Sequence, residues 1–361
     1  MDATKKPVAK GFADQLISTE HLAQLANKKI VAALQRLMLA NQATDVAVAC
    51  SGGVDSAMLA LHATLWARQQ GITLHFFHVH HGLQQRAEGW VQHVHHLAQR
   101  FGVACHTQRV HVDLTQGDGL ESAARTARYQ AFEQMAALTG VRHIFLGHHL
   151  DDQAETVLLR LLRGAGPTGM KAMAEKTERN GLVYLRPLLA IPRSDLVAVA
   201  HEFAKLSHWE PVWDPTNLQD DYTRGALRDR LTPHLNERWR GWQRVLVRHA
   251  QQSQQADEVL NEVAAADLAQ LDLNESDQSF DLALWRKLSV ARQALVLRYW
   301  LAQQGMLMPT QARLDDMMRQ LRQLHALGFD RQMQVKHGKA FVCCSKGRVF
   351  LHFDTSASKA K

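Results

Sequence analysis

Strands and helices alternate along the first half of the chain, and this alternation restricts the fold more than any other feature of the sequence. Apolar runs at 45–50, 72–80, 103–112 and 141–149 are each followed by a helical pattern, and several of these patterns end at a glycine. Apolar runs of this length between helices are typical of right-handed βαβ units on a parallel sheet. The sequence therefore predicts an α/β domain whose ligand lies at the carboxyl ends of parallel strands.

The pattern changes after about residue 164, where a glycine-rich loop leads into a polar stretch rich in Arg and Asp. From about residue 240 the chain is helical in character, with further helices expected at 283–304 and about 310–325 before a strand-like end. We predict four segments: a flexible N-terminal extension at 1–25, an α/β domain at 26–236, a mainly α-helical domain at 240–353 and a disordered tail at 354–361.

Composition narrows the class of protein. The 361 residues include no apolar run near the roughly 20 residues that cross a bilayer, and the charged N-terminus lacks a secretory signal. We therefore expect no membrane partner. The four cysteines form no CxxC pair, which favours a reducing cytoplasm. The net charge of +7 and a pI of about 9.3 suit a polyanionic partner such as nucleic acid.

The string SGGVDS follows the first apolar run directly and opens a helix. Glycines let the chain turn backbone N–H groups toward one point, and the helix N-terminus adds its positive dipole end. The string lacks the GK[ST] ending of a Walker A loop and the spacing of a GxGxxG turn. The residues that we expect to bind phosphate are Ser51, Gly52, Gly53, Val54, Asp55 and Ser56.

Asp55 is the unusual member of this string, because an acid beside a phosphate site is repulsive unless a divalent cation lies between them. We therefore expect Asp55 to contact Mg²⁺ or Mg²⁺-pyrophosphate. The alternative is a purely structural glycine turn, with Asp55 as an acid favoured by the helix dipole.

SGGVDS resembles the PP-loop of the ATP-pyrophosphatase superfamily, whose members split ATP between the α- and β-phosphates. A second string, HHLDDQAET at 148–156, resembles the signature of the tRNA(Ile)-lysidine synthase family. Further similarities, at HVHHGL (78–83), ESAARTARYQAF (121–132), RPLL (186–189) and DPTN (214–217) with YTRGALRDRLTPHL (222–235), extend the resemblance over most of residues 45–240.

The resemblance implies an adenine-nucleotide α-hydrolase-like fold and an ATP-dependent ligase that forms a carbon–nitrogen bond. Such an enzyme joins free L-lysine to the wobble cytidine of a CAU anticodon in tRNA(Ile), using ATP and Mg²⁺. The cytidine is first adenylated and pyrophosphate leaves; the lysine ε-amine then displaces AMP. The mainly helical domain would contact the tRNA.

The same resemblance assigns roles to individual residues. An ε-ammonium group has a pKa near about 10.4, so it needs carboxylates to bind it and accept a proton. Asp151 and Glu155, four residues apart on one helical face, would bind lysine, while Asp152 would meet Mg²⁺ or the nucleotide. The remaining assigned residues are His148 as a catalytic group, Arg125 in the ATP site, and Arg224 and Arg228 as contacts to tRNA or ATP.

Several alternatives stay open. The helix-start acids are common in structural roles, and Gly225 stands where the family pattern leads us to expect Asn after Arg224. A PP-loop tRNA-thiolating enzyme, a small-molecule synthetase and a non-catalytic binding module are the competing functions. The oligomeric state cannot be read from the sequence, and a homodimer is one option.

Overall fold

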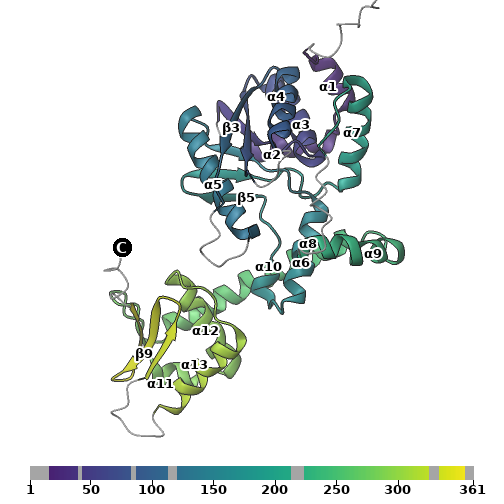
Figure 1. Ribbon diagram of the computed structural model, residues 1–361. Coiled ribbons are helices and arrows are strands. Elements are labelled where there is room, and N and C mark those ends of the chain that lie inside the picture. The colour runs from purple at the N-terminus through teal and green to yellow at the C-terminus, as the bar shows by residue number, and fades with distance from the viewer. Residues whose placement is uncertain are drawn as a thin grey trace, which may run out of the picture. The chain divides into compact units, whose positions relative to one another are not determined.

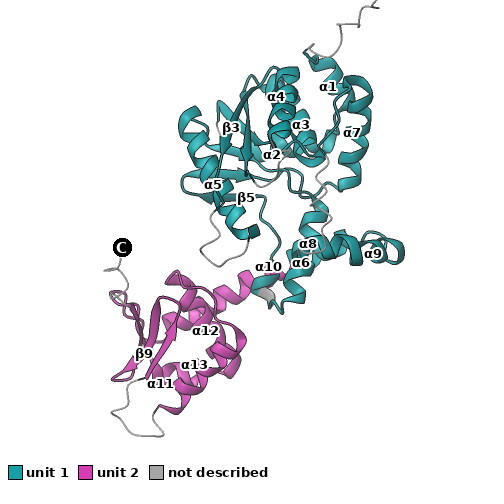
Figure 2. Cartoon of the chain, in the orientation of Figure 1, with its two compact units in different colours: residues 1–251 teal, residues 252–361 magenta. Residues whose placement is uncertain are grey.

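The computed structural model describes residues 16–39, 43–82, 87–112, 120–212, 223–324 and 333–353. The predicted tail at 354–361, the first fifteen residues and the DPTN segment lie outside these ranges. The chain forms two compact units, residues 1–251 and 252–361 (Figures 1 and 2).

The N-terminal unit is built on a six-stranded sheet with the order β3-β2-β1-β4-β6-β5. Its strands are β1 (Asp45–Ala49), β2 (Thr73–His80), β3 (Ala104–Arg109), β4 (His143–Phe145), β5 (Lys176–Arg179) and β6 (Leu182–Leu185). All neighbouring pairs are parallel except β5 and β6, which form a hairpin through Asn180 and Gly181, both with positive φ. The predicted parallel α/β sheet is confirmed, and the antiparallel edge strand β5 is an addition.

Helices cover both faces of this sheet (Figure 1). The helices that begin in this unit are α1 (Thr19–Leu25), α2 (Lys28–Met38), α3 (Val54–Gln70), α4 (Ala87–Phe101), α5 (Leu120–Thr139), α6 (Leu150–Leu162), α7 (Arg193–Ser207), α8 (Thr223–Ala226), α9 (Thr232–Arg238) and α10 (Trp242–Ala269), with short η1 (Pro167–Met170) and η3 (Leu227–Leu231). Helices α8, α9 and α10 lie away from the sheet (Figure 1). Helix α10 continues across the division between the two units.

The two-residue period of the strands divides the core of this unit into two layers. Val46, Val48 and Phe76 face a layer that contains α2, α3, α4 and α7, whereas Ala47 and Phe77 face a layer that contains α5. Helix α3 lies in the first layer and is buried over most of its length, which explains its apolar sequence.

Part of the predicted N-terminal extension is folded. Ser18 caps α1 by accepting a hydrogen bond from the backbone N–H of His21, and Leu22 is fully buried in the first core layer. Residues 19–25 therefore belong to the N-terminal unit, because a buried leucine attaches α1 to α3 and α7.

The C-terminal unit contains three further helices and a small antiparallel sheet of order β7-β10-β9-β8. Its elements are β7 (Phe280–Asp281), α11 (Leu282–Lys287), α12 (Val290–Gln303), α13 (Gln311–Gln323), β8 (Met333–His337), β9 (Ala340–Ser345) and β10 (Arg348–Phe353). The helix expected at 283–304 is divided at Leu288, because Ser289 caps a new helix. Trp285, Trp300 and Phe280 form the centre of its core.

Among the described helices, none combines the length and apolar character that a membrane crossing requires.

Candidate active site

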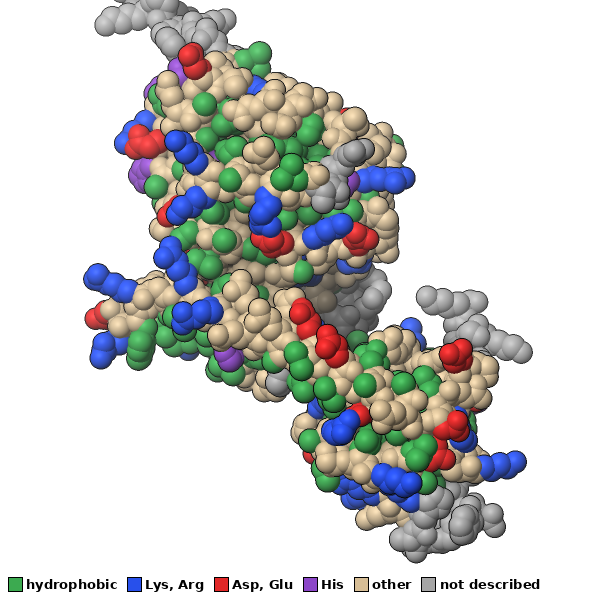
Figure 3. All heavy atoms as spheres, turned by 180° about the vertical axis from the view of Figure 1, so that it is seen from behind, with side chains coloured by type: hydrophobic (Ala, Val, Ile, Leu, Met, Phe, Trp, Pro, Cys, Tyr) green, Lys and Arg blue, Asp and Glu red, His purple; other side chains and the backbone are tan. Residues whose placement is uncertain are grey.

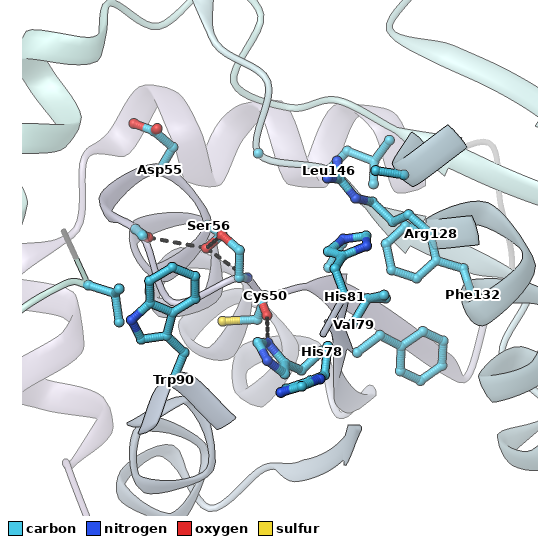
Figure 4. Close-up of a pocket in the computed structure, with 18 of the residues that line it drawn as sticks. Cys50, Asp55, Ser56, His78, Val79, His81, Trp90, Arg128, Phe132 and Leu146 are labelled. Atoms are coloured by element: carbon cyan, nitrogen blue, oxygen red, sulfur yellow. Dashed lines mark hydrogen bonds between the residues drawn. The ribbon is translucent and has the colours of Figure 1, made fainter. Parts of the chain in front are cut away.

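The SGGVDS string forms a tight turn between β1 and α3. Gly52 has a φ of 89°, a conformation that glycine adopts without strain. Gly53 caps α3 without a side-chain hydrogen bond, so no side chain occupies the helix N-terminus. The Ser51 N–H donates to Ser56 Oγ at 3.1 Å, and that hydroxyl donates to the Gly53 carbonyl at 3.1 Å (Figure 4). The loop is therefore pre-formed for an anion.

Two contacts fix the outer side of this loop. The backbone N–H of Val212 donates to the Gly52 carbonyl at 2.9 Å. A Cβ atom at Gly52 would lie 3.0 Å from Cγ2 of Val94 and 3.3 Å from Cγ2 of Val212. Position 52 therefore needs glycine for space as well as for its φ angle.

A pocket of about 530 Å³ opens beside the loop, at the carboxyl ends of β1, β2 and β4. Its lining includes Ser51, Gly53, Asp55 and Ser56 of the loop, together with Gly147 and His148 of the second motif. The size falls in the range of ligand pockets for nucleotide-sized molecules. The pocket lies at the carboxyl ends of parallel strands, where the sequence predicted the ligand site.

The two motifs are in direct contact within this cleft. A Cβ atom at Gly147 would lie 3.3 Å from the backbone N of Ser56, so any larger residue at this position after β4 would press on the first turn of α3. Nε2 of His149 lies 3.7 Å from Oδ2 of Asp55. An anion site and an acidic site are therefore neighbours.

The acidic site begins at the N-terminus of α6. His149 caps the helix: its Nδ1 accepts from the backbone N–H of Asp152 at 3.3 Å, and Asp152 Oδ2 accepts from the His149 backbone N–H at 3.0 Å. One turn later, Glu155 is only 4% exposed. A buried carboxylate requires a cationic partner.

Arg228 supplies that partner. Its Nε donates to Glu155 Oε1 at 2.7 Å, and its Nη2 donates to Glu155 Oε2 at 2.8 Å and to Asp152 Oδ1 at 3.0 Å. Burial disfavours the charged guanidinium, but the hydrogen bond and the charge of Glu155, with the charges of Asp152 and Asp55, outweigh it and raise the pKa of Arg228. The structure thus groups Asp152 with Glu155 through Arg228.

Arg228 reaches these acids from η3, a π-helical turn. Pro233 follows in the first turn of α9; it lacks an N–H and its ring would clash with the carbonyl four residues before it. The chain widens there, and the Thr232 N–H bonds to the carbonyl of Leu227, five residues earlier. The proline thus accounts for the turn that carries Arg228.

Asp55 and Asp151 both contact Arg193, the first residue of α7, but only Asp55 contacts its guanidinium. The Arg193 backbone N–H donates to Asp151 Oδ2 at 2.8 Å, and its Nε lies 3.3 Å from Asp55 Oδ1. Gln243 of α10 adds a contact from Nε2 to Asp151 Oδ1 at 3.3 Å. Burial raises the pKa of Asp55, but the hydrogen bond and charge of His149 and the nearby arginines lower it overall.

The adjacent histidines of the motif lie in opposite electrostatic environments. Burial lowers the pKa of His148 to about 4; the charge of Asp152 opposes this shift, and those of Arg186, Arg125 and Arg224 add to it. Burial also acts on His149, but the hydrogen bond to Asp55 and the charges of the acids raise its pKa. His148 is therefore neutral near pH 7.

We name two groups of residues, in and next to the pocket, by these charges. The acid side comprises Asp55, His149, Asp151, Asp152 and Glu155 with Arg193 and Arg228. The cationic side comprises His81, Arg125, Arg128, His148, Arg186 and Arg224. Figure 4 shows Asp55 at one end of the pocket, with His81 and Arg128 toward the other.

The arginines predicted as ligand contacts do not all lie in the pocket. The guanidinium carbon of Arg125, an exposed residue, lies 5.6 Å from the ring centre of Tyr129, and Arg128 lines the pocket. Arg224 lies 3.5 Å from the hydroxyl of Thr156, and Arg228 belongs to the acid side. Arg193 and Gln243 could not be predicted from the sequence, because no local motif marks them.

The acid side fits a magnesium ion that arrives with ATP. Asp55 Oδ1 is buried beside the phosphate loop and accepts no hydrogen bond, although Nε of Arg193 lies 3.3 Å from it, so a metal ion there would compete with this arginine. No group of three or more metal-binding side chains occurs among the described residues. Nucleotide-bound Mg²⁺ needs only one or two protein carboxylates besides phosphate oxygens and water.

Two family models match the chain. Residues 24–235 match a model described as a PP-loop domain, and residues 280–350 match one described as the TilS substrate binding domain. The U34-tRNA thiolase NcsA from Methanococcus maripaludis, a solved structure with a 4Fe-4S cluster, has a TM-score of 0.51 at 18% identity and covers 65% of this chain and 79% of its own. That likeness shows the fold, and the chain is a PP-loop protein.

Curated relatives narrow the class. A tRNA(Ile)-lysidine synthase of Bordetella pertussis is 51% identical over 306 residues, which cover 85% of this chain and 95% of that protein. One of Burkholderia mallei is 39% identical over 295 residues, covering 80% of this chain and 58% of that protein. The chain belongs to the tRNA(Ile)-lysidine synthase family.

Proposed function

We propose that this protein joins free L-lysine to the wobble cytidine of the CAU anticodon of tRNA(Ile), in an ATP-dependent reaction that forms lysidine. The reaction forms a carbon–nitrogen bond and releases AMP and pyrophosphate. It changes the codon read from AUG to AUA, and the amino-acid identity from Met to Ile. The observation that carries the proposal is the direct contact of an anion loop with a buried acid cluster, through Gly147 and His149.

The first step needs phosphate binding. In our proposal the 2-oxo oxygen of cytidine attacks the α-phosphate, and the bond to pyrophosphate breaks. Gly52, Gly53 and the start of α3 hold the departing phosphates through backbone N–H groups, and the Ser51 hydroxyl adds a contact. A bound Mg²⁺ ion would neutralise charge on those phosphates, with Asp55 as its protein ligand.

The second step needs a site for an ammonium group that must lose a proton. The acids of α6 already bind a cation, since Arg228 contacts both Asp152 and Glu155. We propose that this cluster, with Asp151 at its edge, binds the lysine ε-ammonium and accepts its proton. The amine then attacks C2 of the adenylated cytidine, and AMP takes the electron pair of the breaking carbon–oxygen bond.

Radiolabelled lysine tests the proposal directly. Protein, Mg²⁺-ATP, labelled lysine and bulk bacterial tRNA should give lysine-dependent label on RNA, with one AMP for each lysine. If cognate tRNA(Ile) acquires no label, the proposed reaction is contradicted. Pyrophosphate release that does not depend on lysine, with no label on the RNA, would show that only the first step occurs.

The cysteines argue against the alternative function, a tRNA-thiolating enzyme. Burial raises the pKa of Cys50 to about 11 and that of Cys105 to about 12, although a backbone and a serine hydrogen bond oppose the shift at Cys50. Burial likewise raises the pKa of Cys343, and that of Cys344 to about 11. All four are free thiols that stay protonated at neutral pH, whereas sulfur transfer needs a thiolate.

We also propose that the reaction takes place in the cytoplasm with tRNA as the partner. The free cysteines suit a reducing cytoplasm, and the excess of basic residues suits a tRNA partner. The catalytic domain is assigned to 26–236 and tRNA contact to 240–353. A homodimer is tested by measuring the mass in solution.

A further inference from the structure

We propose that the corner between α9 and α10 binds the loop nucleotides next to the modified base, with Trp239 as a stacking platform. This inference rests on the proposed function and names a surface for its RNA. Four arginines and one tryptophan, Arg238, Trp239, Arg240, Arg244 and Arg248, define this surface, which we call the corner surface.

Within the described ranges, no acidic side chain pairs with the arginines of the corner surface. All four arginines are exposed, and none has an ion-pair partner within the part of the chain that the structure describes. Arg244 and Arg248 are four residues apart on α10, a spacing that favours one helical face, and Arg240 lies in the turn just before this helix. Seen from behind in Figure 3, the projection formed by α9 carries several Lys and Arg side chains. Such a surface attracts phosphates.

The two tryptophans of the corner have different surroundings. Trp242 is 7% exposed and its indole N–H donates to Asn236 Oδ1 at 2.9 Å, so it stabilises the corner. Trp239 is 59% exposed, although exposing so large a ring is unfavourable in water. An exposed aromatic ring among arginines matches the composition of sites that stack unpaired bases.

The corner surface is attached to the acid side. Gln243, between Arg240 and Arg244 in sequence, contacts Asp151 Oδ1 at 3.3 Å and Asn236 Oδ1 at 3.4 Å. A nucleotide that reaches the acid side therefore places its neighbouring phosphates close to these arginines. Single-stranded loop RNA fits this position, because its bases are free to stack and its backbone follows the cationic face.

A charge-matched pair of variants tests the phosphate contacts. Arg240→Gln with Arg244→Gln is compared with Lys28→Gln with Lys29→Gln, which removes two exposed charges at the start of α2. The probe is a fluorescein-labelled RNA hairpin with a CAU anticodon loop, measured by anisotropy between 50 and 200 mM salt. The arginine variant should bind several-fold more weakly at low salt, with a log–log salt slope reduced by roughly 0.7 to 0.9 per contact. The lysine variant should match wild type.

Trp239→Ala and Trp239→Phe test stacking. Loss of the ring should weaken hairpin binding roughly tenfold, and phenylalanine should restore most of it. ATP affinity should stay unchanged in both variants, because the pocket does not include this residue.

The outcomes separate this inference from the proposed function. Wild-type protein that fails to bind the hairpin overturns both. Wild-type binding with equal affinities for the arginine and lysine variants overturns the corner surface alone. A changed mass of the free protein on Trp239→Ala would identify a protein interface instead, and would also overturn the inference.

Discussion

His148 and His149 are neighbours in the chain, yet they belong to opposite sides of the cleft. His148 lies near Arg125, Arg186 and Arg224, and its pKa falls to about 4; His149 lies among the acids, and its pKa is raised. The comparison shows that one strand end divides the cleft into a cationic and an acid side. It also shows why the acid side depends on Arg228, since its charges are buried together.

The largest expected effect comes from breaking the acid side at Arg228. Arg228→Ala leaves Glu155, only 4% exposed, without its counter-ion, so the free energy of unfolding of the N-terminal unit should fall by about 3 kcal/mol or more. Urea unfolding at pH 7.5 measures this. Adding Glu155→Gln to the variant should recover part of the loss.

Arg36→Ala is the matched control. Arg36 also pairs with a glutamate, at 2.6 Å from Glu175, but both side chains are about half exposed. Its removal should cost less than about 1 kcal/mol, because water solvates the remaining charge. Equal losses for the two variants would contradict the importance of burial on the acid side.

The histidines should change the pH dependence of stability in opposite directions. His148 has a folded pKa of about 4, below its ordinary value near about 6.5, so wild type loses stability as pH falls from about 6.5 toward 4. His148→Gln removes this loss. The difference in the free energy of unfolding by which the variant is less stable than wild type should therefore shrink by about 1 to 2 kcal/mol between pH 7.5 and pH 5.

His149 has the reverse sign. Its folded pKa is raised, so its contribution is present below about pH 6.5 and is lost as pH rises through the folded pKa. The deficit of His149→Gln should therefore grow as the pH falls. Urea unfolding of both variants at several pH values checks this. If the stability loss of both variants changes in the same direction with pH, the two histidines do not lie in opposite electrostatic environments.

Gly147 holds the two motifs together, and Gly147→Ala should weaken ATP binding about tenfold. The new methyl group would press on the backbone of Asp55 and Ser56, at 3.4 and 3.3 Å, and overpacking against backbone typically costs about 1 to 3 kcal/mol. Gly89→Ala on α4 is the control, because its added Cβ meets nothing within 4 Å. Calorimetric ATP titration compares them, and unchanged affinity would show that the loop tolerates the shift.

The smallest effect is expected at the edge of the acid side. Asp151→Asn keeps an oxygen that can accept the Arg193 N–H but loses its charge, so the KM for lysine should rise several-fold with little change in stability. Asp195→Asn, an acid in the first turn of α7, should leave KM unchanged. Lysine affinity and turnover that match wild type would exclude Asp151 from lysine binding.

The sequence predicted those parts of the site that short segments encode. SGGVDS specifies its own turn, and strand ends of a parallel sheet meet at one edge, so the shared cleft followed from the alternating pattern. The partners of the acids could not be predicted in this way. Arg228 lies 73 residues from Glu155 and Arg193 lies 42 residues from Asp151, and only the packing of α7 and η3 brings them together.

Some parts of the fold also could not be predicted from short segments of the sequence. The alternating pattern predicted the parallel strands, but the strand order and the antiparallel strand β5 depend on long-range pairing. Ser289 is a typical N-cap residue and could have indicated the start of a new helix. The apolar spacing on both sides nevertheless suggested one continuous helix.

The π-helical turn at Leu227–Leu231 has a consequence for how this protein can evolve. Such a turn amounts to one surplus amino acid in a helix, and each residue of an α-helix advances by about 100°. Loss of a single codon there would rotate Trp239 and the arginines of the corner surface by that angle relative to α8. One insertion or deletion, with no change in side-chain chemistry, would therefore be enough to re-aim the corner surface.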